Sequence, residues 1–146
     1  MAQYGRPSTD TVNESYTDQA EGGTNIYQAI DEASASDADY IKSVAAPTSD
    51  VYVTKLTTLE DPVVHTGHTA RYRYAKNSAG GSQINLTVEL RQNYVSEGSQ
   101  GTLIKQWSHT NISETWTQAN QTLTEGEAGT ITDYTNLYLR FVSNQA

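Results

Sequence analysis

Short runs in which apolar and polar residues alternate constrain this chain more than any other feature. The clearest run places Ile84, Leu86, Val88 and Leu90 on one side, with polar residues between them. A repeat of two residues is typical of a half-buried β-strand and does not fit an amphipathic helix. Further short strands are predicted at residues 25–30, 40–43, 51–56, 69–75, 102–109, 115–124 and 136–143.

About eight short strands separated by turn signals predict an all-β fold. The simplest arrangement is two packed antiparallel sheets, a sandwich of the jelly-roll kind. The chain contains 10 Tyr and 1 Phe, and tyrosine suits a pleated surface that is half buried and half wet. The segment Thr124-Glu125-Gly126-Glu127 has the pattern of a capping box and predicts one short helical turn.

The first 24 residues have a different composition. Their only cation is Arg6, and their apolar content is little more than Tyr4, Val12 and Tyr16. Such a segment buries too little apolar surface to offset the entropy lost on ordering. We therefore predict an extended N-terminal arm at residues 1–24 and a β-sandwich domain at residues 25–146. If the arm orders only against a partner, its removal should leave the thermal unfolding of the body unchanged.

Charge and composition exclude several classes of partner. A formal net charge of -8 argues against electrostatic binding to DNA, RNA or anionic lipid. No stretch approaches the roughly 20 apolar residues needed to cross a bilayer. The chain has no cysteine, so disulfides and thiolate metal sites are excluded. We predict no nucleic-acid partner and no membrane partner.

Residues that could perform catalysis or bind a metal are few. His65 and His68 could share a metal ion, but no third ligand is close in sequence, and a surface loop is favoured. The acidic stretch at residues 31–39 could bind calcium, but it lacks EF-hand spacing, and a solvated turn is favoured. The sequence contains no G-x-S-x-G nucleophile elbow, and Gly80-Gly81 has the form of a hairpin signal. We predict no catalytic residue, no metal, no cofactor and no enzyme activity.

Aromatic residues leave two interpretations of binding open. Trp107 and Trp116 could form a face that stacks on sugar rings, although their positions on predicted strands favour the core. In the N-terminal arm, Tyr4, Arg6 and Pro7 combine an aromatic ring, a cation and a stiff residue. Tyrosine and arginine are frequent anchors of protein interfaces. We therefore take Tyr4, Arg6, Pro7 and Tyr16 as the candidate contact residues of the arm.

Several segments together resemble small virion structural proteins of tailed bacteriophages, including marine phages and cyanophages. The segments that carry the resemblance are Arg6-Pro7-Ser8, Ile26-Tyr27-Gln28-Ala29-Ile30-Asp31-Glu32, Ser36-Asp37-Ala38-Asp39-Tyr40-Ile41, Gly67-His68-Thr69-Ala70-Arg71-Tyr72-Arg73-Tyr74, Thr122-Leu123-Thr124 and Ile131-Thr132-Asp133-Tyr134-Thr135-Asn136-Leu137. They are spread over most of the chain and form a general pattern, not a functional motif.

The resemblance implies a capsid decoration (cement) protein on the outer surface of the phage head. Such proteins bind neighbouring major capsid proteins, often as trimers, and extended terminal arms are a common means of attachment. It therefore implies a homo-oligomer, with a trimer favoured, and the major capsid protein as partner. The alternative is a carbohydrate-binding module or a tail or fibre β-sandwich module. The resemblance transfers no catalytic or ligand-binding residue to this chain.

Overall fold

The computed structural model describes residues 2–78 and 82–146, so the pair Gly80-Gly81 lies outside the described residues. The described part of the chain forms nine strands, one 3-10 helix and one short α-helix. In chain order these are β1 (Pro7–Asn13), β2 (Thr17–Asp18), η1 (Ile26–Ala29), β3 (Ile41–Lys42), β4 (Asp50–Leu56), β5 (Thr69–Tyr74), β6 (Ile84–Gln92), β7 (Thr102–His109), β8 (Thr117–Thr122), α1 (Glu125–Ala128) and β9 (Leu137–Gln145).

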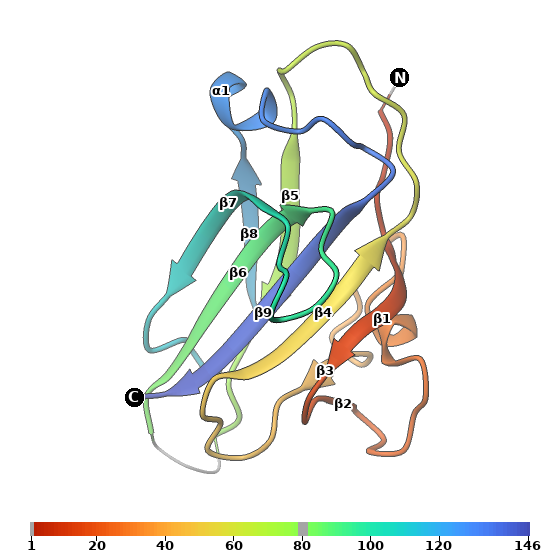
Figure 1. Ribbon diagram of the computed structural model, residues 1–146. Helices are drawn as coiled ribbons and strands as arrows, with labels where there is room; N and C mark the ends of the chain where they lie inside the picture. Colours follow the sequence, from red (N-terminus) through yellow and green to blue (C-terminus); the bar gives the residue numbers. More distant parts are fainter. Residues whose placement is uncertain (1, 79–81) are drawn as a thin grey trace.

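The strands form two antiparallel layers, which confirms the predicted all-β sandwich. The larger layer is a five-stranded sheet with the order β1-β4-β9-β6-β7. The second layer consists of the two-stranded ribbons β2-β3 and β5-β8, and Figure 1 shows β5 and β8 behind the large sheet. Because β1 and β7 are the edges of the large sheet, each pairs on one side only.

The alternating residues of β6 build the core between the layers. Leu86 and Val88 are buried and pack with Tyr72 of β5 and Ala119 of β8. Leu90 belongs to a second buried cluster, which includes apolar residues around α1. Each such side chain contributes about 1.5–3 kcal/mol through burial. The two-residue repeat therefore correctly identified the side of β6 that faces the core.

The predicted capping box is confirmed at α1. The Thr124 hydroxyl accepts a hydrogen bond from the Glu127 amide at 3.2 Å, and the Glu127 carboxylate accepts one from the Thr124 amide at 2.9 Å. This turn places Ala128 fully inside the core. Within the described residues, no helix is both long and apolar enough to cross a membrane.

The N-terminal segment, defined here as residues 2–18, is part of the fold, which corrects the predicted extended arm. β1 pairs with β4 from Pro7 opposite Leu56 to Asn13 opposite Tyr52, with two register shifts along the way. β2 then pairs with β3. The polar residues of this segment are ordered by backbone and side-chain hydrogen bonds, which a count of apolar residues overlooks. The boundary predicted after residue 24 therefore does not separate a free arm from a folded domain.

Two side chains connect the N-terminal segment to the interior. Tyr16 is only 7% exposed and packs with Ile26 and Tyr52. Its hydroxyl forms a hydrogen bond with the Ser143 hydroxyl on β9, and burial raises the pKa of Tyr16 to about 12. Asp10 accepts a hydrogen bond from the Tyr52 hydroxyl at 2.5 Å. The segment thus completes the core at one corner of the sandwich.

Residues 26–29 form a 3-10 helix, which corrects the strand predicted at residues 25–30. The Asp10 carboxylate accepts hydrogen bonds from the amides of Ile26 and Tyr27, at 2.7 and 2.9 Å. These amides begin the helix and would otherwise lack partners. Asn25, before the helix, adopts a left-handed conformation with φ of 62°. Because the capping carboxylate comes from β1, the local sequence could not indicate this helix.

An ion-pair network lies on the opposite face of the large sheet, beneath the loop that joins β6 to β7. Arg140 donates to both carboxylate oxygens of Glu97, at 2.5 and 2.9 Å, and to Glu89 at 3.0 Å. Arg91 also donates to Glu89, at 2.8 Å. Tyr94 in the loop donates to Glu97 at 2.6 Å, and its ring is buried. The network therefore binds the loop to the sheet.

Candidate functional site

The four candidate contact residues occupy different environments. Tyr4 is 61% exposed, and the Arg6 guanidinium lies over its ring at 5.3 Å from the centroid. Pro7 is half-buried at the start of β1. Tyr16 is buried in the core, so the folded chain does not present it to a partner. The structure therefore keeps Tyr4, Arg6 and Pro7 together near the surface and separates Tyr16 from them.

The residues around Tyr4 are held by the segment that follows β4. The Gln3 side chain donates to the Glu60 carbonyl at 3.0 Å and accepts from the Glu60 amide at 2.8 Å. The Arg6 carbonyl accepts a hydrogen bond from the Thr57 amide at 2.8 Å, and the Arg6 amide donates one to the Thr57 hydroxyl at 3.1 Å. These bonds join the first residues of the chain to the segment after β4 and give Tyr4 a defined position.

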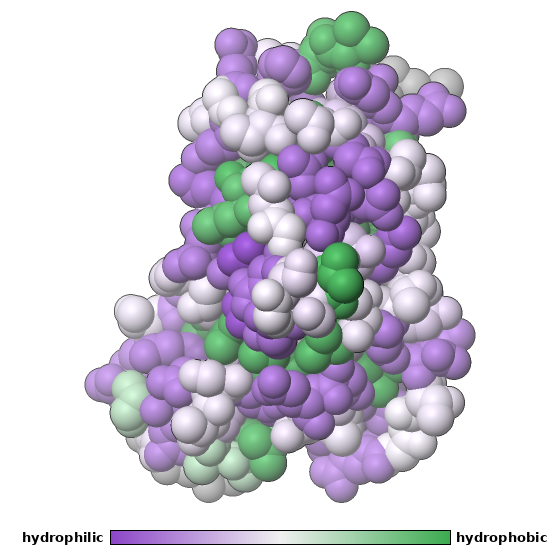
Figure 2. Space-filling view, in the orientation of Figure 1, coloured by the Kyte–Doolittle hydropathy of each residue, from purple (hydrophilic) through white to green (hydrophobic). Residues whose placement is uncertain are grey.

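Exposed apolar side chains gather at this end of the sandwich. Val63 is 85% exposed and Val64 is 54% exposed, both in the loop between β4 and β5. A hollow of about 480 Å³ lies between this loop and the N-terminal end, lined by Gln3, Glu60, Asp61, Pro62 and Val64. Figure 1 shows the N-terminal end beside the loop, and Figure 2 shows an apolar patch over the loop. We call Tyr4, Pro62, Val63 and Val64 the apical surface.

The loop tip holds Val63 in an unfavourable backbone conformation. Its φ is 64°, in the left-handed region that β-branched residues rarely adopt. The Asp61 carboxylate accepts a hydrogen bond from the Val63 amide at 2.8 Å and thereby stabilises the turn. Strained and exposed apolar residues are features of contact sites. The apical surface is therefore the candidate functional site.

The two histidines of the same loop do not converge on a shared ligand position. His68 contacts the Tyr134 hydroxyl through Nε2 at 2.7 Å, and the two rings lie 5.8 Å apart. The Nδ1 atom of His68 is buried without a hydrogen-bond partner, and His65 is exposed. Residues 2–78 and 82–146 contain no group of three or more His, Cys, Asp or Glu that could hold a metal.

The acidic stretch at residues 31–39 is divided between two roles. Asp37 forms a two-pronged ion pair with Arg73 at 2.7 and 2.8 Å, which joins this loop to β5. Asp39 accepts a hydrogen bond from Gln19 at 3.1 Å. The predicted loop conformation is confirmed, but its carboxylates do not meet at one point.

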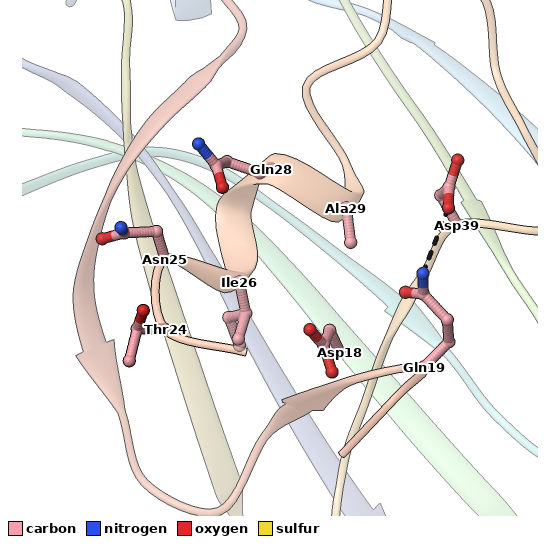
Figure 3. Close-up of a pocket in the computed structure, with 8 residues that line it drawn as sticks. All are labelled: Asp18, Gln19, Thr24, Asn25, Ile26, Gln28, Ala29 and Asp39. Carbon is pink, nitrogen blue, oxygen red and sulfur yellow. Dashed lines mark hydrogen bonds between the residues drawn. The ribbon is translucent and has the colours of Figure 1, made fainter. Parts of the chain in front are cut away.

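Asp39 also borders a small polar pocket of about 180 Å³ between the N-terminal segment and η1. Figure 3 shows the eight residues that line it: Asp18, Gln19, Thr24, Asn25, Ile26, Gln28, Ala29 and Asp39. Two of them are carboxylates, and the Asp39 carboxylate is already hydrogen-bonded to Gln19. The pocket lies beside the turn at residues 21–25.

The two tryptophans have different surroundings. Trp107 is half-buried and packs against both apolar clusters between the layers, as predicted for a core residue. Trp116 is also half-buried but lies at the boundary, with its ring 5.8 Å from that of Tyr40. A single flat face formed by both tryptophans is therefore not present in the described residues.

His109, at the end of β7, lies between two tyrosine hydroxyls. Its Nε2 is 2.7 Å from the Tyr72 hydroxyl, and its Nδ1 is 3.1 Å from the Tyr74 hydroxyl. A neutral imidazole offers one donor and one acceptor, which lets one hydroxyl accept and the other donate. Burial lowers the pKa of His109 because the protonated ring loses hydration.

This lowered pKa predicts a pH-dependent stability. The folded state resists protonation of His109, so its contribution is complete above the unfolded pKa of about 6.5 and is lost as pH falls below that value. The melting temperature should therefore decrease as the pH is lowered from about 7.5 to about 5.5. His109→Gln should make this decrease smaller. An unchanged slope in the variant would contradict the assignment to His109.

Comparisons with known proteins give no assignment for the fold or the site. No protein-family model, curated protein or solved structure matches this chain. The sequence had marked Tyr4 and Arg6 but missed the loop tip at residues 62–64. Its only signal was a run of three apolar residues, Pro62-Val63-Val64, without strand alternation.

Proposed function

We propose that this chain is a structural protein of a tailed-bacteriophage virion, which decorates the outer capsid surface by binding major capsid proteins. The observation that carries the proposal is the apical surface, where Tyr4, Val63 and Val64 are exposed on adjoining, hydrogen-bonded segments. The resemblance to phage virion proteins supports the same class. When a partner removes exposed apolar groups of this kind from water, the free energy of the complex is lowered.

In this proposal attachment uses a preformed surface instead of a free arm. Tyr4 is already held by Gln3, Arg6 and their partners after β4, so little ordering entropy is lost on binding. The contact is small, and a single copy would bind weakly. A capsid lattice compensates for weak contacts because linked copies bind several sites at once. A homo-oligomer, such as the trimer that the resemblance implies, would benefit most.

A charged substitution at the loop tip tests the proposed contact. Val63→Asp should reduce attachment of the purified protein to undecorated capsids by about tenfold or more, because it places a carboxylate in an apolar contact. Val95→Asp is the matched control, since Val95 is 71% exposed but lies in the loop between β6 and β7. Binding can be measured by co-sedimentation with capsids. Equal binding by both variants would exclude the apical surface.

Copy number in purified virions tests the location. A decoration protein should approach a fixed stoichiometric ratio to the major capsid protein in quantitative mass spectrometry. A handful of copies per particle would instead place the protein in the tail. Absence from particles would reject the virion assignment altogether.

The half-buried Trp116 beside Tyr40 favours one alternative, a carbohydrate-binding module. An aromatic pair at a sheet boundary can stack on a sugar ring. Quenching of tryptophan fluorescence by glycans, abolished in a folded Trp116→Ala variant, would favour this alternative over capsid decoration.

A further inference from the structure

The N-terminal segment lies at the edge of the large sheet and is joined to the body by a short turn. Figure 1 shows β1 beside β4 at the outer edge of the sheet. Two of its apolar side chains pack on the body: Val12 is half-buried and Tyr16 is buried. Because β1 pairs with β4 alone, the β1 of a second copy can replace it without changing the pairing among the other strands.

The turn that returns the chain from β2 to η1 is strained. Glu21 and Asn25 both have left-handed backbones, with φ of 61° and 62°. Gly22 and Gly23 lie between them, and a Cβ on Gly23 would be 2.0 Å from an Asp18 carboxylate oxygen. Figure 3 shows Thr24 and Asn25 leading into η1 close to Asp18. An extended turn would release Glu21 from its left-handed conformation, and strained hinge turns favour exchange of the element they connect.

The contacts of the N-terminal segment are specific and lie on residues beyond the turn. Val51 donates its amide to the Glu14 carboxylate at 3.0 Å, and the Tyr52 hydroxyl donates to Asp10 at 2.5 Å. Tyr16 bonds to Ser143 on β9. Every one of these partners is present in a second copy of the chain in the same geometry. A second copy can therefore accept the segment with the same hydrogen bonds and the same buried ring.

We propose that the N-terminal segment exchanges between copies, so that β1 of one chain pairs with β4 of another. The closed and the exchanged forms differ mainly in the turn at residues 21–25. Strain in that turn favours exchange, whereas the loss of translational freedom opposes it, so the exchanged fraction rises with protein concentration. The segment is thus both an integral strand of a lone chain and a link between copies.

Paired cysteine variants test the exchange, because the natural chain has no cysteine. Thr9 of β1 is paired with Lys55 of β4 in the sheet register. Thr9→Cys and isotopically labelled Lys55→Cys would be unfolded together, refolded at high concentration and treated with a short bismaleimide. We expect a cross-linked product that contains one labelled and one unlabelled chain. Thr87→Cys with Ser108→Cys, paired between β6 and β7, is the control that should give no mixed product.

Turn variants supply a second readout. Glu21→Gly removes the left-handed strain and should lower the mixed product by at least about fivefold relative to Glu21→Ala. Both variants lose the Glu21–Lys42 ion pair, so they differ only in backbone freedom. The proposal is overturned if the double variant Thr9→Cys/Lys55→Cys cross-links within one chain while the mixed single variants give no more product than the control pair.

Discussion

Deletion of residues 2–23 is expected to unfold the isolated protein or to lower its melting temperature sharply. The deletion removes the edge strand β1 and the Asp10 carboxylate that caps η1. It also removes Tyr16, which is 7% exposed, and thereby uncovers Tyr52 and Ile26. Loss of one large buried aromatic ring alone costs about 3–5 kcal/mol. That is a large part of the roughly 5–15 kcal/mol by which domains are stable.

A shorter deletion provides the control. Removing residues 2–5 takes away Tyr4 and the Gln3 side chain that bonds to Glu60, but it leaves β1, Asp10 and Tyr16 in place. Thermal unfolding followed by far-UV circular dichroism should therefore change little in the short deletion and greatly in the long one. Equal melting temperatures for the long deletion and the natural chain would restore the original prediction of an independent arm.

Arg140→Ala should be the most damaging single substitution on the outer face of the sheet. Arg140 is the common partner of Glu89 and Glu97, and the side chains of Arg140 and Glu89 are only 13% and 6% exposed. Without Arg140, Glu97 has lost its ion-pair partner and Glu89 keeps only Arg91. Removing one member of a buried ion pair costs up to about 3–5 kcal/mol. Without Arg140, the loop that carries Tyr94 also loses its main link to the sheet. Urea titration, which gives the free energy of unfolding, measures the combined effect of both losses.

Matched substitutions separate charge from geometry. Arg140→Lys keeps the charge but cannot reproduce the two-pronged bond to Glu97, so its stability should lie between those of the natural chain and Arg140→Ala. Lys42→Ala breaks the exposed pair with Glu21 and should have no measurable effect. A loss of stability for Lys42→Ala as large as that for Arg140→Ala would contradict this account of the network.

The same ion-pair network predicts that the fold loses stability in acid. Burial alone would raise the pKa of Glu89, but hydrogen bonds and charge from Arg91 and Arg140 outweigh it and hold this pKa below its usual value. The hydrogen bond from Arg140 likewise lowers the pKa of Glu97. Carboxylates with lowered pKa values stabilise the fold above their unfolded pKa of about 4.5 and lose that contribution as pH falls through the folded pKa. Arg140→Ala should flatten this part of the stability curve.

The sequence was most informative where burial follows a simple period. The alternation from Ile84 to Leu90 located β6 and its inward face correctly. The Thr124–Glu127 pattern located α1 because a capping box is a local interaction. Both features depend on neighbours in the chain, which a sequence displays directly.

The sequence failed where long-range hydrogen bonds replace apolar burial. Composition alone led to a free arm, because Asp10 and Glu14 were counted as solvated charges. In the fold they accept hydrogen bonds from Tyr27 and Val51, far along the chain. The apical surface was only half found for the same reason: Gln3, beside Tyr4, and Val64, beside Val63, line the same hollow through tertiary contacts, not through sequence.

The central claim is that the polar N-terminal segment is folded on a lone chain, so that the apical surface is preformed. Hydrogen–deuterium exchange of the dilute, unassembled protein tests this most directly. We predict slow exchange for the paired amides of β1 and for Ile26 and Tyr27, whose amides are bonded to Asp10. Complete exchange of residues 7–27 at the rate of an unfolded peptide, while β4 and β9 stay protected, would contradict it.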